Sequence, residues 1–344
     1  MQRICSEKIL LCFFIVFFIT THARAQSTLP DEIFHADTIK RIVSFLAADS
    51  LKGRLTGSGE ISKATNFIAK EFQQSGLLPV AGMEGYFSEF LFWDNRSEQR
   101  RGMNVIGAIP GKSKKEELIL FCAHYDHVGT KSTNPNEIYS NKVTQDLSDT
   151  IYNGANDNAS GTAAILLLGR YFVKLANNER TILFITFSGE EFGLKGSYAF
   201  SSLIDPNSVK AVINIEMIGR GLTSNKQNPY ITGEQFSDLD EILNNRLRKQ
   251  KMDSSGRKIY FKKDPYIQEN LFSRSDNYPF AVKGIPAHTL MATSPADDYY
   301  HSVNDEIELL DFRNMSHIIK AIALSCTGLV TGKDTPSRID TKKL

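Results

Sequence analysis

The sequence predicts an α/β fold built around a largely parallel central sheet. Short apolar runs suited to buried strands recur along the chain, and between several of them the apolar residues have helical spacing. Strands that alternate with helices in this way form parallel sheets covered by helices. The chain shows no internal repeat and no low-complexity linker, so a single domain over residues 26–344 is the simplest organisation.

The first 25 residues have the features of a secretory signal peptide. Arg3 and Lys8 precede an apolar run over residues 9–19, and the segment ends in Ala23-Arg24-Ala25. A short apolar run followed by Ala-x-Ala predicts cleavage after Ala25 and a secreted or periplasmic protein without stable membrane insertion. An N-terminal membrane anchor is the alternative, but the run is shorter than the roughly 18 apolar residues that a spanning helix needs.

The remaining elements follow from hydrophobic periodicity. Two amphipathic helices are expected within residues 35–75, on either side of a loop at 52–57. Apolar runs predict strands at 104–109, 118–123, 181–187, 209–215 and 285–291. Helical patterns predict helices at 159–175, 194–203, 239–248 and 312–329. The polar segment 128–152 is too long for a routine connection, so it is interpreted as either a partial lid or an inert insertion.

Composition leaves the function to be found in local sites. The chain has 40 Lys and Arg residues against 39 Asp and Glu, a net charge of +1, so nothing indicates nucleic acid or an acidic membrane as a partner. Two cysteines remain once the signal peptide is removed, Cys122 in an apolar run and Cys326 in a predicted helix. Buried free thiols and a single disulfide are both compatible with these positions.

Histidines and acids stand where predicted strands end. His124 ends the run at 118–123, Glu191 follows the run at 181–187 by a short turn, and Glu216 ends the run at 209–215. Asp157 immediately precedes a predicted helix, and His301 follows the last apolar run by a short loop. Because open α/β sheets bind ligands at the carboxyl ends of their strands, we expect these side chains to meet.

Two imidazoles and three carboxylates, with no thiolate, form a set that zinc binds readily. Five ligand residues are too many for one catalytic zinc with an open position, but they suit two zinc ions if one carboxylate bridges them. Of the adjacent acids Glu190 and Glu191, one is expected to bind metal and the other to act as general base. Each residue alone has an ordinary explanation, such as a helix cap for Asp157, so the prediction depends on their combination.

With these residues located, the chain resembles the dizinc, or co-catalytic zinc, aminopeptidase family that also contains glutaminyl cyclases and the protease-like domain of the transferrin receptor. The clearest matches are AHYDH at Ala123–His127, NGANDNASG at Asn153–Gly161, FSGEEFGLKGS at Phe187–Ser197, NIEMIGR at Asn214–Arg220 and YHSVND at Tyr300–Asp305. Weaker similarity covers LKGRLTGS at Leu51–Ser58, SDNYPF at Ser275–Phe280 and GIPAHTL at Gly284–Leu290. The resemblance implies a three-layer, zinc-exopeptidase-like fold, in which helices enclose a mixed, mostly parallel sheet of about eight strands.

The resemblance also implies how the metal ligands divide. His124 and Glu216 correspond to ligands of a first zinc, Glu191 and His301 to ligands of a second, and Asp157 to the bridging carboxylate. The family usually has aspartate where this chain has Glu216. Since glutamate is one methylene longer, weaker affinity at the first site, or a divalent metal other than zinc there, is expected.

Three further acids match family positions without being metal ligands. Glu190 corresponds to the general base, and Asp126 to a carboxylate behind His124 that holds the orientation of the imidazole. Asp276 resembles another acid behind the ligands. These assignments make Glu190 and Asp126 the predicted catalytic residues.

The predicted activity is therefore that of a zinc-dependent exopeptidase. The chain is expected to be an aminopeptidase that hydrolyses N-terminal residues of peptides through a metal-bound hydroxide, with Glu190 as general base. A glutaminyl cyclase, which would need one zinc, and a non-catalytic binding domain are the alternatives. The complete ligand set, especially His124, favours the peptidase, whereas the preferred N-terminal residue and the oligomeric state are not predicted.

Overall fold

The computed structural model describes residues 28–133, 148–221, 229–250 and 259–344. The predicted signal peptide over residues 1–25, with its cut after Ala25, lies outside the described residues. So does the middle of the predicted lid or insertion loop, residues 134–147. Within the described ranges, no helix is both long and apolar enough to span a membrane.

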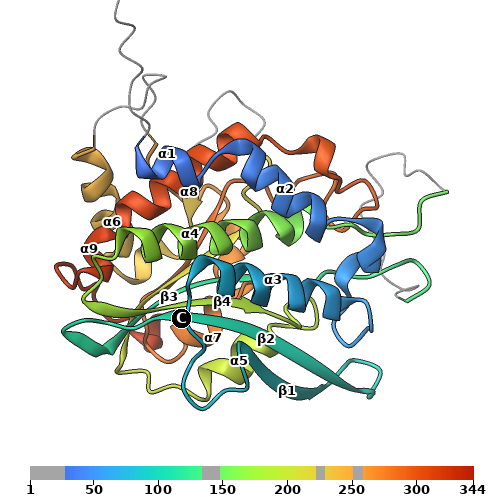
Figure 1. The fold of residues 1–344 in the computed structure, drawn as a ribbon, viewed down its shortest axis with the longest axis horizontal. Helices are drawn as coiled ribbons and strands as arrows, with labels where there is room; N and C mark the ends of the chain where they lie inside the picture. Colours follow the sequence, from blue (N-terminus) through green and yellow to red (C-terminus); the bar gives the residue numbers. More distant parts are fainter. Residues whose placement is uncertain (1–27, 134–147, 222–228, 251–258) are drawn as a thin grey trace, which may run out of the picture.

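An eight-stranded mixed sheet forms the centre of the molecule (Figure 1), with strand order β1-β2-β4-β3-β5-β8-β6-β7. The strands are β1 (Phe87–Trp93), β2 (Gln99–Ile109), β3 (Lys114–His124), β4 (Arg180–Phe187), β5 (Val209–Glu216), β6 (Tyr230–Ile231), β7 (Lys262–Lys263) and β8 (Ala287–Met291). The four neighbouring strands β4, β3, β5 and β8 run parallel. The pairs β1–β2, β2–β4 and β6–β8 are antiparallel.

The predicted α/β fold and its mixed sheet are thus confirmed, but the expectation of a mostly parallel sheet is only partly right. Strands β1 and β2 are joined by the short loop 94–98, and so short a connection permits only antiparallel pairing. Strands β3, β4, β5 and β8 are linked through helices, which allows them to run parallel. The run of four parallel strands is therefore at the centre, where the candidate site residues lie, and the two-residue strands β6 and β7 form a further parallel pair at the edge.

Helices cover both faces of the sheet. They are α1 (Leu29–Ile33), α2 (Ala36–Leu46), α3 (Ile61–Ser75), α4 (Gly161–Leu175), α5 (Lys195–Ser201), α6 (Leu239–Arg248), α7 (Tyr278–Ala281), α8 (Phe312–Ser325) and α9 (Thr327–Val330), with a 3-10 segment η1 (Asp49–Arg54) and one π-helical turn η2 (Ala155–Ser160). In Figure 1, α1, α2, α3, α4 and α8 lie above the sheet, and α5 and α7 below it. The helix predicted at 312–329 divides at Cys326 into α8 and α9.

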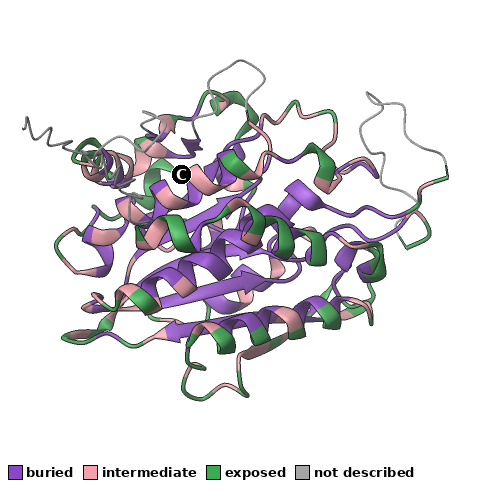
Figure 2. Cartoon of the chain, turned by 45° about the horizontal axis from the view of Figure 1, so that its top comes forward, coloured by how far each residue is buried: buried purple, intermediate pink, exposed green. Residues whose placement is uncertain are grey.

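The core has two parts, one on each face of the sheet. In β3, Phe121 packs in the cluster formed with α2, α3, α4 and α8, whereas Leu120 and Cys122 pack on the opposite face with Phe200 of α5. Strands that are apolar on both faces are what a sheet covered on both sides requires. Figure 2 shows these strands buried between helices whose outer surfaces are exposed.

The two cysteines outside the signal segment are both buried and unpaired. Cys122 belongs to the cluster below the sheet and Cys326 to the cluster above it, so the sheet itself separates them. The disulfide left open by the sequence is therefore absent among the described residues. Burial raises the pKa of the Cys326 thiol to about 12, as expected for an unreactive core residue.

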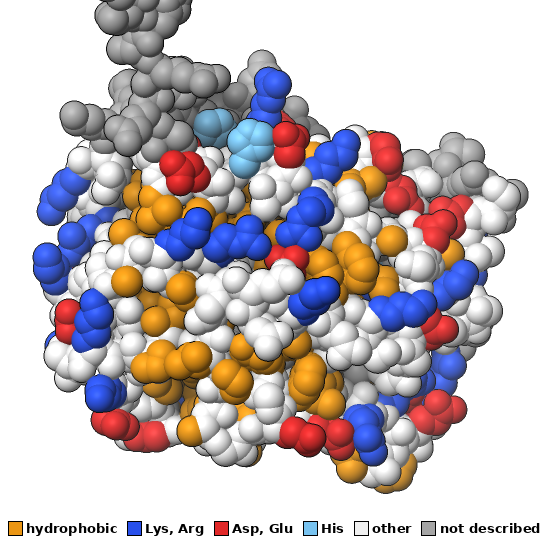
Figure 3. Space-filling view, in the orientation of Figure 1, with side chains coloured by type: hydrophobic (Ala, Val, Ile, Leu, Met, Phe, Trp, Pro, Cys, Tyr) orange, Lys and Arg blue, Asp and Glu red, His pale blue; other side chains and the backbone are white. Residues whose placement is uncertain are grey.

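Charges of both signs are interspersed over the surface. On the face shown in Figure 3, Lys and Arg side chains alternate with Asp, Glu, uncharged and hydrophobic side chains. This face therefore carries no large patch of a single sign, in keeping with the chain's net charge of +1.

Candidate metal centre

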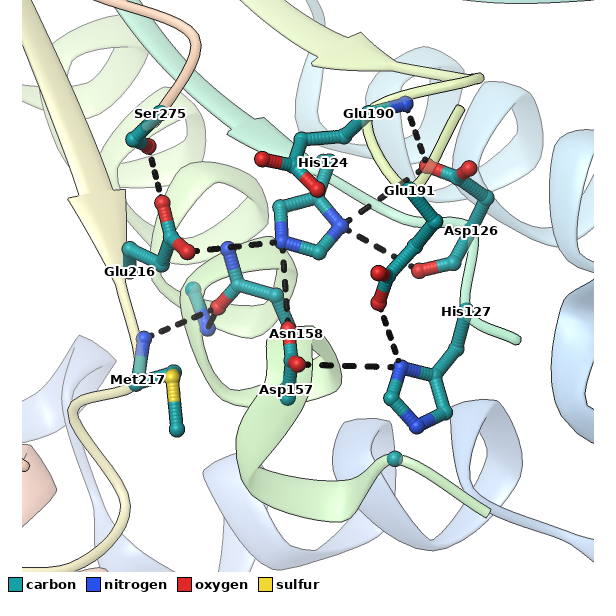
Figure 4. A network of polar contacts seen from close by, with 12 residues as sticks. His124, Asp126, His127, Asp157, Asn158, Glu190, Glu191, Glu216, Met217 and Ser275 are labelled. Atoms are coloured by element: carbon teal, nitrogen blue, oxygen red, sulfur yellow. Dashed lines mark hydrogen bonds and ion pairs between the residues drawn. The ribbon is translucent and has the colours of Figure 1, made fainter. Parts of the chain in front are cut away.

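The predicted site residues gather at one edge of the parallel strands. His124 is the last residue of β3, Glu216 is the last residue of β5, and Glu190 and Glu191 lie on the turn that follows β4. Because neighbouring parallel strands end at the same edge, these side chains point toward a common space, as Figure 4 shows.

Asp157 reaches the same space from η2, the turn that precedes α4. Its backbone N–H donates to Asp305 Oδ2 at 3.0 Å. The adjacent Asn158 joins the turn to the end of β5, since its Nδ2 donates to the Ile215 carbonyl at 3.0 Å and its Oδ1 accepts from the Met217 N–H at 3.2 Å. These bonds explain why so irregular a turn holds one orientation.

Asp157 lies between two imidazoles. Its Oδ1 is 3.2 Å from His124 Nε2, and its Oδ2 is 3.4 Å from His301 Nε2. Each imidazole faces a second carboxylate, with Glu216 Oε1 at 3.8 Å from His124 Nε2 and Glu191 Oε2 at 3.0 Å from His301 Nε2. All five residues predicted as metal ligands therefore lie in one cluster.

The spacing of this cluster suits bound cations. Tetrahedral zinc with bonds of about 2.0–2.2 Å places its ligand atoms roughly 3.3–3.6 Å apart. One group, His124, Asp157 and Glu216, and another, His127, Asp157, Glu191 and His301, each have their ligand atoms within 4.8 Å of one another. Nε2 of His124 forms no hydrogen bond among the described residues, although two carboxylates face it. The residues present therefore fit a pair of divalent metal ions.

The adjacent acids Glu190 and Glu191 differ in their electrostatic environments. Burial, together with the charges of Glu216 and Glu191, raises the pKa of Glu190 well above its ordinary value. Burial acts to raise the pKa of Glu191 too, but His301 and His127 lower it to about 2. Burial likewise opposes protonation of His124, yet nearby carboxylates, Glu190 foremost, raise its pKa well above the ordinary value. The two adjacent acids thus lie in opposite electrostatic environments, as expected where one is a metal ligand and the other a general base.

Asp126 contacts the base-bearing turn more closely than it contacts the ring of His124. Its Oδ2 accepts from the Gly189 N–H at 2.8 Å and from Thr56 Oγ1 at 2.9 Å, and its Oδ1 accepts from the Glu190 N–H at 3.3 Å. By contrast, Nδ1 of His124 is 3.7 Å from the Asp126 carboxylate and 3.2 Å from the Asp126 backbone oxygen. Asp126 thus links the end of β3 to the turn that carries Glu190.

The longer side chain of Glu216 is held by Ser275, whose hydroxyl donates to Glu216 Oε2. The other oxygen, Oε1, faces His124. The chain turns sharply directly afterwards, because Met217 has a φ of +48°. The longer glutamate is therefore accommodated by its hydrogen bond from Ser275 and by the bend at Met217. In the sequence, the family resemblance of Ser275–Phe280 was the signal for Ser275.

Arg54 was not predicted to matter, yet it joins the two loops that carry the cluster. Its buried guanidinium donates to the carbonyls of Tyr125 at 2.7 Å, Asn153 at 2.6 Å and Gly154 at 2.9 Å. Burial lowers the pKa of this arginine to about 10. In the sequence, the weak family similarity at Leu51–Ser58 included this arginine but implied no role for it.

A cavity opens beside the group formed by His124, Asp157 and Glu216. Its lining comprises Asp157, Glu190, Glu216, Met217, Leu271, Arg274, Ser275, Met291, Ser294, Pro295 and Tyr300. One wall is therefore acidic and another apolar. The ring of Tyr300 stacks on His301 with centroids 3.9 Å apart, which fixes the tyrosine at the cavity wall.

Comparisons with known proteins agree with this geometry. A family profile described as Peptidase family M28 matches residues 104–325. A "Probable leucine aminopeptidase" of Trichophyton verrucosum is 24% identical over 306 residues, which cover 83% of this chain and 74% of that protein.

Two solved structures show the same fold. BSAP, a zinc aminopeptidase from Bacillus subtilis, superposes with a TM-score of 0.63 at 16% identity, covering 87% of this chain and 95% of its own. The glutaminyl cyclase of Porphyromonas gingivalis superposes with a TM-score of 0.66 at 14% identity, covering 87% and 99%.

Proposed function

This chain belongs to peptidase family M28, and we propose that it is a zinc-dependent aminopeptidase that removes N-terminal residues from peptides. The observation that carries the proposal is the position of Asp157, whose two carboxylate oxygens face His124 and His301 separately. The names of the leucine aminopeptidase relative and of the structurally similar zinc aminopeptidase support the same activity.

We assign one zinc ion to His124, Asp157 and Glu216, and a second to Asp157, Glu191 and His301, with Asp157 shared. When bound, such a pair supplies Lewis-acid polarisation of the substrate carbonyl and activation of water. Three carboxylates would leave such a pair with a net charge of +1, the sign that stabilises negative charge on the carbonyl oxygen during hydrolysis.

Glu190 is the residue that moves the proton. It lines the cavity beside Asp157 and Glu216, and burial raises its pKa well above the ordinary value, which makes it a stronger base. It accepts the proton of the attacking water and transfers it to the leaving amine. Asp126 keeps Glu190 in position by accepting hydrogen bonds from the turn that carries it.

Tyr300 is positioned to bind the substrate carbonyl. Its ring lines the cavity and stacks on His301. Burial and the surrounding carboxylates raise the pKa of Tyr300 well above its ordinary value, so its hydroxyl keeps the proton that it donates. A donor aimed at the developing oxyanion is a common contribution to hydrolysis.

The apolar wall of the cavity indicates which N-terminal side chains are accepted. Met217, Leu271 and Met291 offer aliphatic and thioether surface next to the acidic residues. A leucine or methionine side chain buries its apolar surface against these three residues. We therefore propose a preference for aliphatic N-terminal residues, and secreted or periplasmic action if the predicted signal peptide is cleaved.

The test is an assay of residues 26–344 with metal analysis. We expect about two zinc ions per chain by the bridging argument, hydrolysis of leucine p-nitroanilide, loss of that activity on chelation and recovery with Zn²⁺. N-acetylation of the substrate removes the free amine and should abolish cleavage. Full activity after exhaustive chelation contradicts the proposal, and pyroglutamate formation from an N-terminal glutaminyl peptide, without anilide hydrolysis, identifies a glutaminyl cyclase instead.

A further inference from the structure

His127 is a fully buried imidazole beside the proposed second metal site, and the mechanism above gives it no role. It lies three residues beyond the end of β3, and Figure 4 shows it next to Glu191. Its Nδ1 is 2.8 Å from Glu191 Oε1, while the other oxygen of Glu191, Oε2, is 3.0 Å from His301 Nε2. The two carboxylate oxygens of Glu191 therefore have different partners.

The position of the His127 ring is set by the backbone around it. The His127 N–H donates to the Arg54 carbonyl at 3.3 Å. Gly154, at a φ of +55°, packs against the ring so closely that a Cβ atom there would lie 2.5 Å from ring carbons. Besides its edge-on packing against His301, the ring is thus held by contacts that do not involve the proposed metal ligands.

The geometry favours a hydrogen-bond donor over a metal ligand. A separation of 2.8 Å is typical of a charge-assisted hydrogen bond, whereas Asp157 Oδ2 is 3.8 Å from the same nitrogen. Nε2 of His127 is buried without a hydrogen bond among the described residues. If Nδ1 bound metal, Nε2 would have to carry a buried proton with no acceptor, which is costly. With the proton on Nδ1, Nε2 is only an unused acceptor.

We propose that His127 is a positioning residue: its Nδ1–H holds Oε1 of Glu191, so that Oε2 alone is presented to the second metal ion. The inference rests on the proposed function, because it assumes that Glu191 binds zinc. Without this donor the carboxylate is free to rotate or to bind with both oxygens. Loss of a hydrogen bond to a metal ligand typically costs about 10–100-fold in metal affinity.

Two substitutions separate this role from the alternatives. In His127→Asn the amide nitrogen takes nearly the position of Nδ1, so the donor is retained. In His127→Leu the volume is similar but the donor is lost. We expect His127→Leu to weaken binding of the second Zn²⁺ by about 10–100-fold, and His127→Asn to retain most of the wild-type affinity. Both affinities are measured by titrating Zn²⁺ into metal-free protein against a competing chelator.

A spectrum gives a readout independent of activity. In the Co²⁺-substituted protein, His127→Leu should alter the visible absorption bands, because the coordination of Glu191 changes, whereas His127→Asn should leave them close to wild type. His127→Gln, whose amide reaches the position of Nε2 instead, should behave like His127→Leu and replaces that variant if it fails to fold.

His288 provides a matched control. It is also fully buried, but its Nδ1 is 2.8 Å from the Thr232 carbonyl and its Nε2 is 2.7 Å from the Ser237 hydroxyl. His288→Asn and His288→Leu should lower thermal stability without changing zinc affinity.

Unchanged affinity and spectrum in both His127→Leu and His127→Gln overturn the inference, as does an equal loss in His127→Asn and His127→Leu, which would make His127 a direct ligand. If wild-type protein binds no zinc, the proposed function fails instead, so the two failures are distinct.

Discussion

The two halves of the metal centre share Asp157 but differ in how the protein holds them. In the half with His124 and Glu216, the glutamate receives a hydrogen bond from Ser275, and both Glu216 and Asp157 line the cavity. In the half with Glu191 and His301, both oxygens of Glu191 face an imidazole, and neither residue lines the cavity. The half with His124 and Glu216 is therefore open to the cavity, and the half with Glu191 and His301 is set apart from it.

The largest expected effect comes from substitution of Glu190, the proposed general base on the cavity side of the centre. Glu190→Gln keeps the shape of the side chain but cannot accept a proton, so turnover of leucine p-nitroanilide should fall by about 10²–10⁴-fold. Zinc content, measured on the same preparation, should stay at the wild-type value. Unchanged turnover would show that another group moves the proton.

Removal of one ligand from each half tests whether the two sites bind independently. Glu216→Ala should lower zinc content toward one ion per chain, because His124 and Asp157 alone give too few ligands for tight binding. Glu191→Ala is the matched variant in the half with Glu191 and His301, and it should also lose one ion. Two ions retained in Glu216→Ala, measured by metal analysis after dialysis, would mean that other residues build the open site.

A smaller effect is expected when the partner of a ligand is removed. Ser275→Ala deletes the hydroxyl that donates to Glu216, and should weaken the first Zn²⁺ by about 10–100-fold while leaving the second unchanged. Ser275→Ala is thus the counterpart of His127→Leu, which removes the hydrogen bond to Glu191 in the other half of the centre. Stepwise zinc titration of both variants should show the losses at different ions, and a loss at the same ion in both would contradict the division of the site.

The smallest expected effect concerns an imidazole outside the centre. Burial lowers the pKa of His288 from 6.5 to about 4, so the unfolded chain binds a proton at higher pH than the folded one. The stability contributed by neutral His288 is therefore present above pH 6.5 and is lost as the pH falls toward 4. Urea unfolding of wild type and His288→Asn at pH 7.5 and 5 should show a smaller difference between them at pH 5; a constant difference would contradict the shift.

Much of the fold was predictable because its central strands are buried on both faces. The runs at 118–123, 181–187 and 209–215 are predominantly apolar and lie within β3, β4 and β5. Strand β1 was not predicted, because it is an edge strand with exposed residues such as Leu91 and Trp93 and contains no continuous buried run. The two-residue strands β6 and β7 are too short to produce any periodic pattern.

The candidate site was predictable to the level of residue type and order along the chain. His124, Glu191 and Glu216 stand at or just beyond strand ends, and local patterns reveal where buried strands stop. The roles of Arg54, Ser275 and His127 were not predictable, because each acts through hydrogen bonds to residues far away in the chain. Their neighbourhoods resemble the family, but a buried polar residue has no periodicity that would reveal its partners.

The amino-acid sequence alone determined the α/β class, the family resemblance and the set of acids and imidazoles expected to meet. These depend only on apolar periodicity and on motifs of a few residues. Tertiary contacts decided the rest: that each oxygen of Asp157 faces a different imidazole, that Asp126 holds the turn of Glu190, and that Glu216 lines the cavity whereas Glu191 and His301 do not. The physical reason is that a hydrogen bond depends on distances of a few tenths of an ångström between residues that are dozens of positions apart.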